Sequence, residues 1–199
     1  QTEGVKLMFD RMRKVQNIDK DAKTVTVQAG CNLSFNPYDP TESSTLANSL
    51  FYLLDQAGLA FTDMGGISLQ TVSGFLLTGS SGGSLKYGVG EMLLSITLVD
   101  GTGEVRTYSK SDANLDHFHA AGLSMGLLGI VTELKFQCVD RFYIKGTETL
   151  NDIDKSVVDL TGPGSDGRKS LEEFLRTEDY ARVEWWPQKG VNKLAVWQA

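Results

Sequence analysis

Residues 64–88 form the stretch whose residue types and spacing could do chemistry. Glycine, serine and threonine dominate it, Lys86 is its only charged residue, and an apolar run from Val72 to Leu77 lies in its middle. Glycine lets the backbone adopt positive φ and lets a ligand approach the main chain closely. Hydroxyl and backbone N–H groups then supply hydrogen bonds without a fixed charge. A loop of this composition can hold the phosphates and ribose of a nucleotide.

The common phosphate-loop motifs are absent. Counted from Gly79, a P-loop would place Gly-Lys at positions 84 and 85, where the chain has Ser84 and Leu85. Two Gly-x-Gly starts, at 88–90 and 101–103, each lack the third glycine of the dinucleotide fingerprint. On composition alone, a tight turn between two buried elements is therefore an alternative to a nucleotide site.

Three segments together resemble a known family: Gly58 to Ile67, Gln70 to Gly74, and Thr78 to Gly82. Their order is similar to that in the FAD-binding domain of the vanillyl-alcohol oxidase (PCMH-type) flavoproteins. Within that family the resemblance is to the sugar and lactone oxidases, such as gulonolactone, arabinonolactone and alditol oxidases. Those enzymes often carry Thr-Gly-Thr-His-Gly in the last segment, so Ser81 stands here in place of a frequent histidine.

The resemblance implies an α+β fold in two parts. Residues 1–139 would be the second subdomain of the FAD-binding fold, with the first subdomain missing, and residues 140–199 would begin an α+β substrate-binding cap. FAD is the implied cofactor. Its expected contacts lie in the glycine-rich stretch and in a later Gly-Ile-Val-Thr segment, for which a plain loop-to-strand junction is the alternative. These residues are Gly66, Thr71, Ser73, Gly74, Thr78, Gly79, Ser80, Ser81, Gly82, Gly83, Gly129, Ile130 and Val131.

The implied activity is that of an FAD-dependent oxidoreductase. It would oxidise an alcohol or a sugar or lactone hydroxyl by hydride transfer to flavin N5, with oxygen or another acceptor reoxidising the flavin. Arg182 and Glu184, with Trp186, alternate on one face of a predicted strand and are the candidates for substrate contact or catalysis; a solvated strand face is the alternative. A non-catalytic FAD-binding or fold-only module, and a nucleotide- or sugar-phosphate-binding protein without flavin, also stay open.

Composition narrows the other function classes. The chain has 199 residues, is 41% hydrophobic and 22% charged, and carries a net charge of −6, which is typical of globular material. It has no basic run for nucleic acid and no apolar run of the roughly 20 residues that a membrane span needs. It begins at Gln1 without a signal-peptide pattern, so the sequence does not indicate its compartment.

Residues 1–199 alone are expected to bind FAD weakly or not at all, because half of the pyrophosphate cradle would be missing.

Neither cysteine nor histidine indicates a metal site. Cys31 and Cys138 lie far apart without neighbouring ligands, as two buried thiols would. His117 and His119 are two positions apart, which suits neither a helical zinc pair nor a zinc finger. On a short helix they are typical surface or packing residues, although acid–base roles are an alternative.

The remaining pattern predicts the elements that position these residues. Helices are expected at about 45–57, with Ser43, Ser44 or Thr45 as N-cap and Gly58 as stop, and from a cap at Ser111 or Asp112 through Ala121. Strands are expected at 23–30 and 133–138, with a hairpin around Asp100 and Gly101. After residue 140 the pattern predicts helices at 151–160 and 170–176, joined by a flexible connection at 161–167, and then strands at 180–187 and 191–198.

Overall fold

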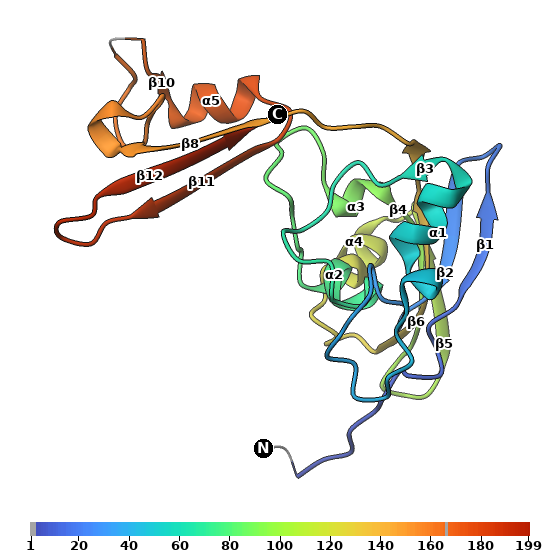
Figure 1. Ribbon diagram of the computed structural model, residues 1–199. Coiled ribbons are helices and arrows are strands. Elements are labelled where there is room, and N and C mark those ends of the chain that lie inside the picture. The colour runs from blue at the N-terminus through green and yellow to red at the C-terminus, as the bar shows by residue number, and fades with distance from the viewer. Residues whose placement is uncertain (1–2, 166) are drawn as a thin grey trace. The chain divides into compact units, whose positions relative to one another are not determined.

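The computed structural model describes residues 3–165 and 167–199, which form two compact units (Figure 1). The first unit comprises the chain up to Ser80 together with Val89–Arg141, and the second comprises Ser81–Gly88 and Phe142–Ala199. Each unit has its own sheet and its own buried apolar cluster. The mixture of helices and strands confirms the predicted α+β class. The assignment of an FAD-binding domain to residues 1–139 and of a cap to residues 140–199 stays a prediction.

A five-stranded antiparallel sheet in the order β1-β2-β6-β4-β5 forms the frame of the first unit. The strands are β1 (Val15–Asp19), β2 (Thr24–Gln28), β4 (Leu93–Val99), β5 (Val105–Ser109) and β6 (Ile130–Gln137). Apolar residues alternate with hydroxyl and charged residues along β2, β4 and β6, so one sheet face is apolar and the other polar. The predicted strands and the hairpin are confirmed; Asp100 closes the hairpin by accepting hydrogen bonds from the N–H groups of Thr102 and Glu104.

Helices cover the apolar face of this sheet, and Figure 1 shows them together on one side of it. They are α1 (Leu50–Ala57), α2 (Val72–Leu77), α3 (Val89–Met92) and α4 (Asp116–Gly122). A short pair, β3 (Leu59–Ala60) with β7 (Val139–Asp140), lies after α1 and after β6 in the chain. The core between helices and sheet buries large side chains from every layer, among them Leu54, Phe75, Ile96, Phe118 and Phe136. Full burial of such a side chain contributes roughly 1.5–3 kcal/mol.

The predicted helix over 45–57 consists of two elements. Thr45 caps the 3-10 turn η1 (Leu46–Asn48) in a reciprocal capping box with Asn48. Ser49 then takes an extended conformation, φ −84° and ψ 148°, so the α-helix begins only at Leu50. Gly58 ends α1 at φ 77°, which confirms the predicted stop.

The predicted cap of the next helix is wrong. α4 begins at Asp116 without a side-chain cap hydrogen bond. Asp112 instead accepts a hydrogen bond from the N–H of Ser109, and Ser111 Oγ lies 2.8 Å from Ser109 Oγ. Both cap candidates therefore form hydrogen bonds with Ser109, in the turn that follows β5, rather than with the first turn of α4.

The two histidines of α4 lie at the surface beside aromatic rings, and the two cysteines are buried. His117 and His119 are both exposed, and their rings lie beside those of Tyr108 and Phe118. Cys31 and Cys138 are buried and unpaired, which confirms the prediction of two buried thiols. Burial raises the pKa of each thiol to about 12, so neither is a thiolate nucleophile at neutral pH.

The second unit is a three-stranded antiparallel sheet with one helix packed against it. The sheet order is β11-β12-β8, with β8 (Thr147–Asp152), β11 (Ala181–Trp186) and β12 (Lys193–Gln198). The helix α5 (Leu171–Thr177) contributes Phe174 to a core that also buries Val158, Ala181, Leu194 and Val196. The predicted helix 170–176 and strands 180–187 and 191–198 are confirmed, with bounds shifted by up to two residues. Asp166, within the predicted connection 161–167, lies outside the described residues.

The predicted helix at 151–160 is wrong. Asn151 and Asp152 end β8, where they pair with Leu194 and Lys193 of β12. The rest of the segment forms the 3-10 turn η2 (Ile153–Lys155) and the strand β9 (Val158–Asp159), which pairs with β10 (Lys169–Ser170). Strand pairing and the 2.6 Å ion pair between Asp152 and Lys193 outweigh a local helix preference of a few tenths of a kcal/mol per residue.

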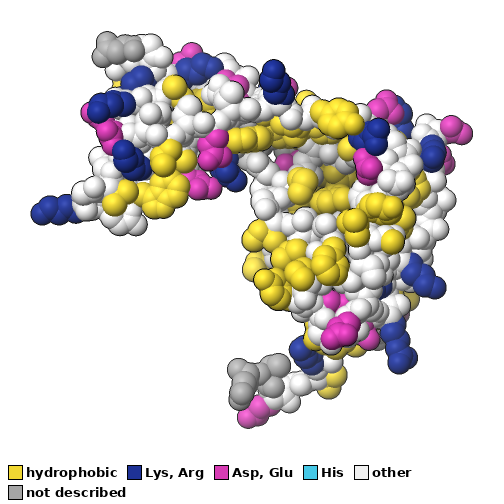
Figure 2. All heavy atoms as spheres, in the orientation of Figure 1, with side chains coloured by type: hydrophobic (Ala, Val, Ile, Leu, Met, Phe, Trp, Pro, Cys, Tyr) yellow, Lys and Arg dark blue, Asp and Glu magenta, His cyan; other side chains and the backbone are white. Residues whose placement is uncertain are grey.

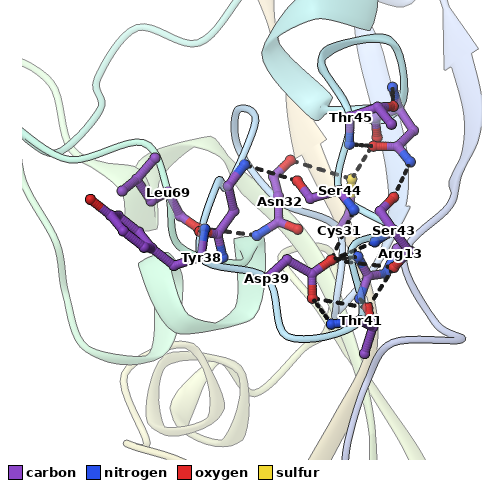
Figure 3. A network of polar contacts seen from close by, with 12 residues as sticks. Arg13, Cys31, Asn32, Tyr38, Asp39, Thr41, Ser43, Ser44, Thr45 and Leu69 are labelled. Carbon is purple, nitrogen blue, oxygen red and sulfur yellow. Dashed lines mark hydrogen bonds and ion pairs between the residues drawn. The ribbon is translucent and has the colours of Figure 1, made fainter.

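An ion pair between Arg13 and Asp39 holds the loop between residues 36 and 44 (Figure 3). Arg13 Nη1 donates to Asp39 Oδ2 at 2.8 Å, and the two side chains are only 16% and 8% exposed. Asp39 also accepts hydrogen bonds from the N–H groups of Thr41 and Ser44. The Arg13 hydrogen bond, followed by those of the loop, holds the pKa of Asp39 well below its usual range.

We expect Asp39→Asn to destabilise the protein in a pH-dependent way. Because the folded-state pKa of Asp39 is depressed, its charge contributes stability that is present above the unfolded pKa of about 3.9 and is lost as pH falls through the folded pKa. The melting temperature of the variant should therefore lie below that of the parent at pH 7, and the gap should narrow on acidification. Thermal unfolding followed by circular dichroism measures both. Asp21→Asn, at an exposed turn residue, is the control, and a pH-independent gap would contradict the assignment.

Candidate functional site

The start of the glycine-rich stretch is hydrogen-bonded to residues 29–34. The N–H of Val72 donates to Cys31 O at 2.8 Å, and the N–H of Leu33 donates to Gln70 O at 3.0 Å. The Asn32 side chain donates to Leu69 O at 3.0 Å, as Figure 3 shows. These bonds hold the polar residues of the stretch in a defined position, although few of them carry a side chain large enough to pack.

Three predicted cofactor contacts, Thr71, Ser73 and Gly74, lie at the start of α2. Thr71 Oγ1 accepts a hydrogen bond from the N–H of Gly74 at 3.3 Å and thereby caps the helix. Ser73 Oγ donates to Ala29 O at 2.8 Å. Both hydroxyl groups therefore have a local structural role, and their contact with a cofactor stays a prediction.

The end of α2 engages two of the backbone N–H groups expected to meet a pyrophosphate. The N–H of Gly79 donates to Leu76 O at 3.0 Å, and that of Ser80 donates to Phe75 O at 3.1 Å. Gly79 adopts φ 64°, so the pair forms the glycine-terminated C-cap common at helix ends. The donors left for a ligand in this turn are side-chain groups rather than these two N–H groups.

Side-chain donors gather where the stretch folds back on itself. Ser80 Oγ lies 3.5 Å from both amide atoms of Gln70, and 3.3 Å from Thr78 Oγ1. Gly65 lies against the same pair, because a Cβ added there would come within 3.4 Å of Ser80 Cβ and 3.6 Å of Gln70 Nε2. Gln70 is absent from the predicted contacts, although it opens the segment Gln70 to Gly74 that carries part of the family resemblance.

This arrangement fits a dinucleotide cofactor. Gln70 and Ser80 offer neutral amide and hydroxyl donors that are half-buried, whereas the exposed Thr78 hydroxyl already donates to Gly74 O at 2.7 Å. Residues 64–88 contain no Asp or Glu to repel phosphates. The main chain at Gly66, another predicted contact, is open, since nothing would lie within 4 Å of a Cβ placed there. The main chain at Gly66 and the side chains of Gln70 and Ser80 are thus the groups of this turn that are available to a ligand, and contact of Gly66 and Ser80 with FAD stays a prediction.

The predicted contacts Ser81, Gly82 and Gly83 belong to the second unit. The carbonyl of Gly83 accepts the N–H of Ala181 at 2.9 Å, and a Cβ at Gly83 would lie 2.2 Å from Ala181 O. Ser84 Oγ donates to Asp179 O, and the Tyr87 ring stacks on that of Tyr180. The approach to β11 thus accounts for a glycine at position 83.

Packing also accounts for a glycine at the predicted contact Gly129. It adopts φ 148°, and a Cβ there would lie 2.4 Å from Val99 O. Val131 is buried in the core, whereas Ile130 is 45% exposed. The segment before it exposes Leu123, Met125, Leu127 and Leu128; Figure 2 shows that apolar side chains reach the surface on the face in view. Contact of Gly129, Ile130 and Val131 with the adenine end stays a prediction.

The catalytic candidates Arg182 and Glu184 lie on the sheet face opposite α5. Arg182 forms ion pairs at 3.2 Å with Glu148 of β8 and with Glu184. Strand alternation places Trp186 on the same face, and all of these side chains are exposed. The face is thus a cluster of charges beside an aromatic ring, which can bind a polar, hydroxylated molecule.

Two further properties bear on function. Across the described ranges 3–165 and 167–199, no group of three or more His, Cys, Asp and Glu side chains could hold a metal ion. No helix in those ranges is long and apolar enough to cross a membrane.

The chain is similar to known FAD-binding proteins. Residues 41–109 match the family model described as an FAD binding domain. L-gulonolactone oxidase from Mus musculus is 29% identical over 187 residues, covering 94% of this chain and 37% of the relative. The resemblance to the PCMH-type FAD-binding flavoproteins predicted from the sequence is thereby confirmed. FAD, the cofactor predicted from the sequence, is the cofactor of this domain.

A second lactone oxidase relative is similar over most of this chain, and a solved structure shares its fold. A putative D-arabinono-1,4-lactone oxidase from Neurospora crassa is 30% identical over 192 residues, covering 96% of this chain and 30% of the relative. A variant of cholesterol oxidase from Brevibacterium sterolicum superposes with a TM-score of 0.69 at 17% identity, covering 94% of this chain and 34% of that chain, which shows the shared fold. The chain spans about a third of the length of these relatives.

We expect Gly129→Ala to destabilise the flavoprotein by about 2 kcal/mol or more, because the new Cβ would meet Val99 O and occupy an unfavourable positive φ. Gly101→Ala is the matched control, since its Cβ would meet nothing within 4 Å. Urea unfolding followed by far-UV circular dichroism measures both. Equal stability of the two variants would show that a glycine at 129 is not required by packing.

Proposed function

We propose that this chain is part of an FAD-dependent oxidoreductase that oxidises an alcohol or a sugar or lactone hydroxyl, with oxygen as acceptor. The observation that supports this most is the extent of the similarity. The match to lactone oxidases covers 94–96% of the chain, including the second unit, whereas the FAD-domain match ends at residue 109. A module that only bound FAD would have no need of a lactone-oxidase-like second unit.

The chain's own residues would bind and orient the reacting groups. The chemistry that FAD supplies when bound is acceptance of a hydride from the substrate carbon at flavin N5 and its delivery to oxygen or another acceptor. Gln70 and Ser80 would donate hydrogen bonds to the cofactor phosphates or ribose, and Thr78, whose hydroxyl proton goes to Gly74 O, would accept a hydrogen bond from a ribose hydroxyl. Because these donors are neutral and largely tied to each other, they would position the cofactor at little reorganisation cost.

The second unit would supply substrate contacts. Arg182 can donate several hydrogen bonds to hydroxyl or carbonyl oxygens, and Glu184 can accept a hydrogen bond from a hydroxyl or hold its proton. Their mutual ion pair at 3.2 Å keeps the Arg182 guanidinium oriented along the strand. Trp186 on the same face would pack against the apolar side of a sugar ring.

We expect Gln70→Ala and Ser80→Ala to weaken FAD binding. Each removes one or two neutral hydrogen bonds worth about 1 kcal/mol each, so the dissociation constant should rise roughly five- to thirtyfold. The measurement is flavin content per polypeptide of the full-length protein by absorbance, with fluorescence titration of the apoprotein where the flavin can be removed. Thr107→Ala, which removes an exposed hydroxyl on β5, is the control. Unchanged flavin content and affinity in both variants would remove these residues from the proposed site.

We expect Arg182→Gln to lower kcat/KM for the oxidised substrate by about tenfold or more, as loss of one charge-assisted hydrogen bond to a bound oxygen implies. Arg176→Gln breaks a comparable exposed ion pair with Glu172 on α5 and is the matched control. Both exposed pairs contribute little to stability, so both variants should fold. Oxygen uptake with a panel of lactones, sugars and polyols measures the effect. Equal rates for the two variants would assign Arg182 to the solvated surface, and failure of every substrate to reduce the bound flavin would favour a non-catalytic module.

A further inference from the structure

A depression on the polar face of the first unit's sheet is separate from the residues assigned above. It has a volume of about 460 Å³ and is lined by Leu94, Ser95, Ser109, Lys110, Ser111 and Lys135. Its lining thus combines hydroxyl and ammonium groups with a single leucine and contains no carboxylate.

Strand register brings the lining together. Ser95 of β4 pairs with Ser109 of β5 on one side and with Lys135 of β6 on the other. The three side chains therefore form one row across three strands, on the face away from the helices. Lys110 and Ser111 follow directly after β5 and close the end of the row.

The two lysines lack an acidic partner. Neither Lys110 nor Lys135 forms an ion pair with another residue of the ranges 3–165 and 167–199. Lys135 is half-buried, so its ammonium group is partly removed from water without a counter-charge. Glu133 lies one row along the same face, opposite Thr97, but outside the depression. The carboxylate of Asp112 accepts the N–H of the lining residue Ser109 but is not itself part of the lining. In a chain of net charge −6, the lining therefore carries two positive charges and no negative one.

The depression also offers hydrogen-bond donors. Lys110 Nζ gives one bond to Glu91 O at 3.0 Å, which orients the group and leaves its other two protons available. The Ser95 hydroxyl forms no hydrogen bond within the described ranges. Ser109 Oγ donates to Leu94 O at 3.4 Å and lies 2.8 Å from Ser111 Oγ, a contact in which either hydroxyl can donate.

We propose that this depression binds the phosphate group of a small phosphorylated molecule or inorganic phosphate itself. A phosphate carries close to two negative charges at neutral pH and three strong acceptor oxygens, which match two ammonium groups flanked by hydroxyls. The volume exceeds that of one phosphate group and is within the range of small-molecule sites, so a phosphomonoester of polyol size also fits.

The test measures phosphate binding to the full-length, FAD-loaded protein by the 31P NMR line width of added inorganic phosphate. Loading with FAD keeps added phosphate from the dinucleotide site. We expect saturable broadening, and about tenfold weaker binding in Lys135→Gln and in Lys110→Gln, because each loses a charge-assisted contact. Lys20→Gln, in the exposed turn between β1 and β2, is the matched control. Flavin absorbance and circular dichroism establish that each variant is folded.

Each outcome decides the proposal. Saturable binding that is lost in the two pocket variants and kept in Lys20→Gln supports it. A tighter affinity for glycerol 3-phosphate than for inorganic phosphate would identify a phosphomonoester as the ligand, and equal affinities would identify the free anion. Broadening that does not saturate, or that is unchanged when Lys110 and Lys135 are both replaced by Gln, would overturn it.

Discussion

The main chain of residues 29–34 is the constraint on which the first unit depends. It enters from β2 and is hydrogen-bonded on two sides. Towards the glycine-rich stretch it accepts N–H groups from Val72 and Ser73, and towards α1 its carbonyls at Asn32 and Leu33 accept those of Leu50 and Phe51. Cys31 and Leu33 are fully buried, so each of these backbone groups would be costly without a partner. One short segment thus sets the positions of both α1 and the candidate cofactor residues.

That constraint explains why the glycine-rich stretch is so polar and yet ordered. Many of its polar groups form hydrogen bonds within the protein. Thr71 caps α2, Ser73 donates to Ala29 O, and Gly79 ends the helix. What remains available to FAD is a smaller set around Gln70 and Ser80 that is held in place by those bonds. In the proposed site, these neutral hydrogen bonds would preorganise the donors that meet the anionic cofactor.

The two units present different chemistry. The first carries hydroxyl and amide donors on a scaffold of helices against a sheet, and the second carries Arg182, Glu148 and Glu184 as an exposed charge cluster on a strand face. Similarity to lactone oxidases extends through both units. On the polar face of the first sheet, Lys110 and Lys135 add a third, basic environment that the flavin chemistry does not require.

The sequence by itself determined the elements with strong local signals and the cofactor family. Alternating valines marked β2, Gly58 marked the end of α1, Asp100 marked the hairpin, and the ordered glycine-hydroxyl segments identified an FAD-binding domain, because each signal lies within a few neighbouring residues. Only the tertiary structure decided the rest. Residues 147–152 became a strand because β12 offered pairing partners, Gly129 and Gly83 were explained by distant backbone atoms, and Gln70 met Ser80 through a fold of the chain. Contacts between residues far apart in the chain produce no periodic pattern in the sequence, because they depend on which surfaces the packed sheet brings together. They therefore could not be predicted from the sequence.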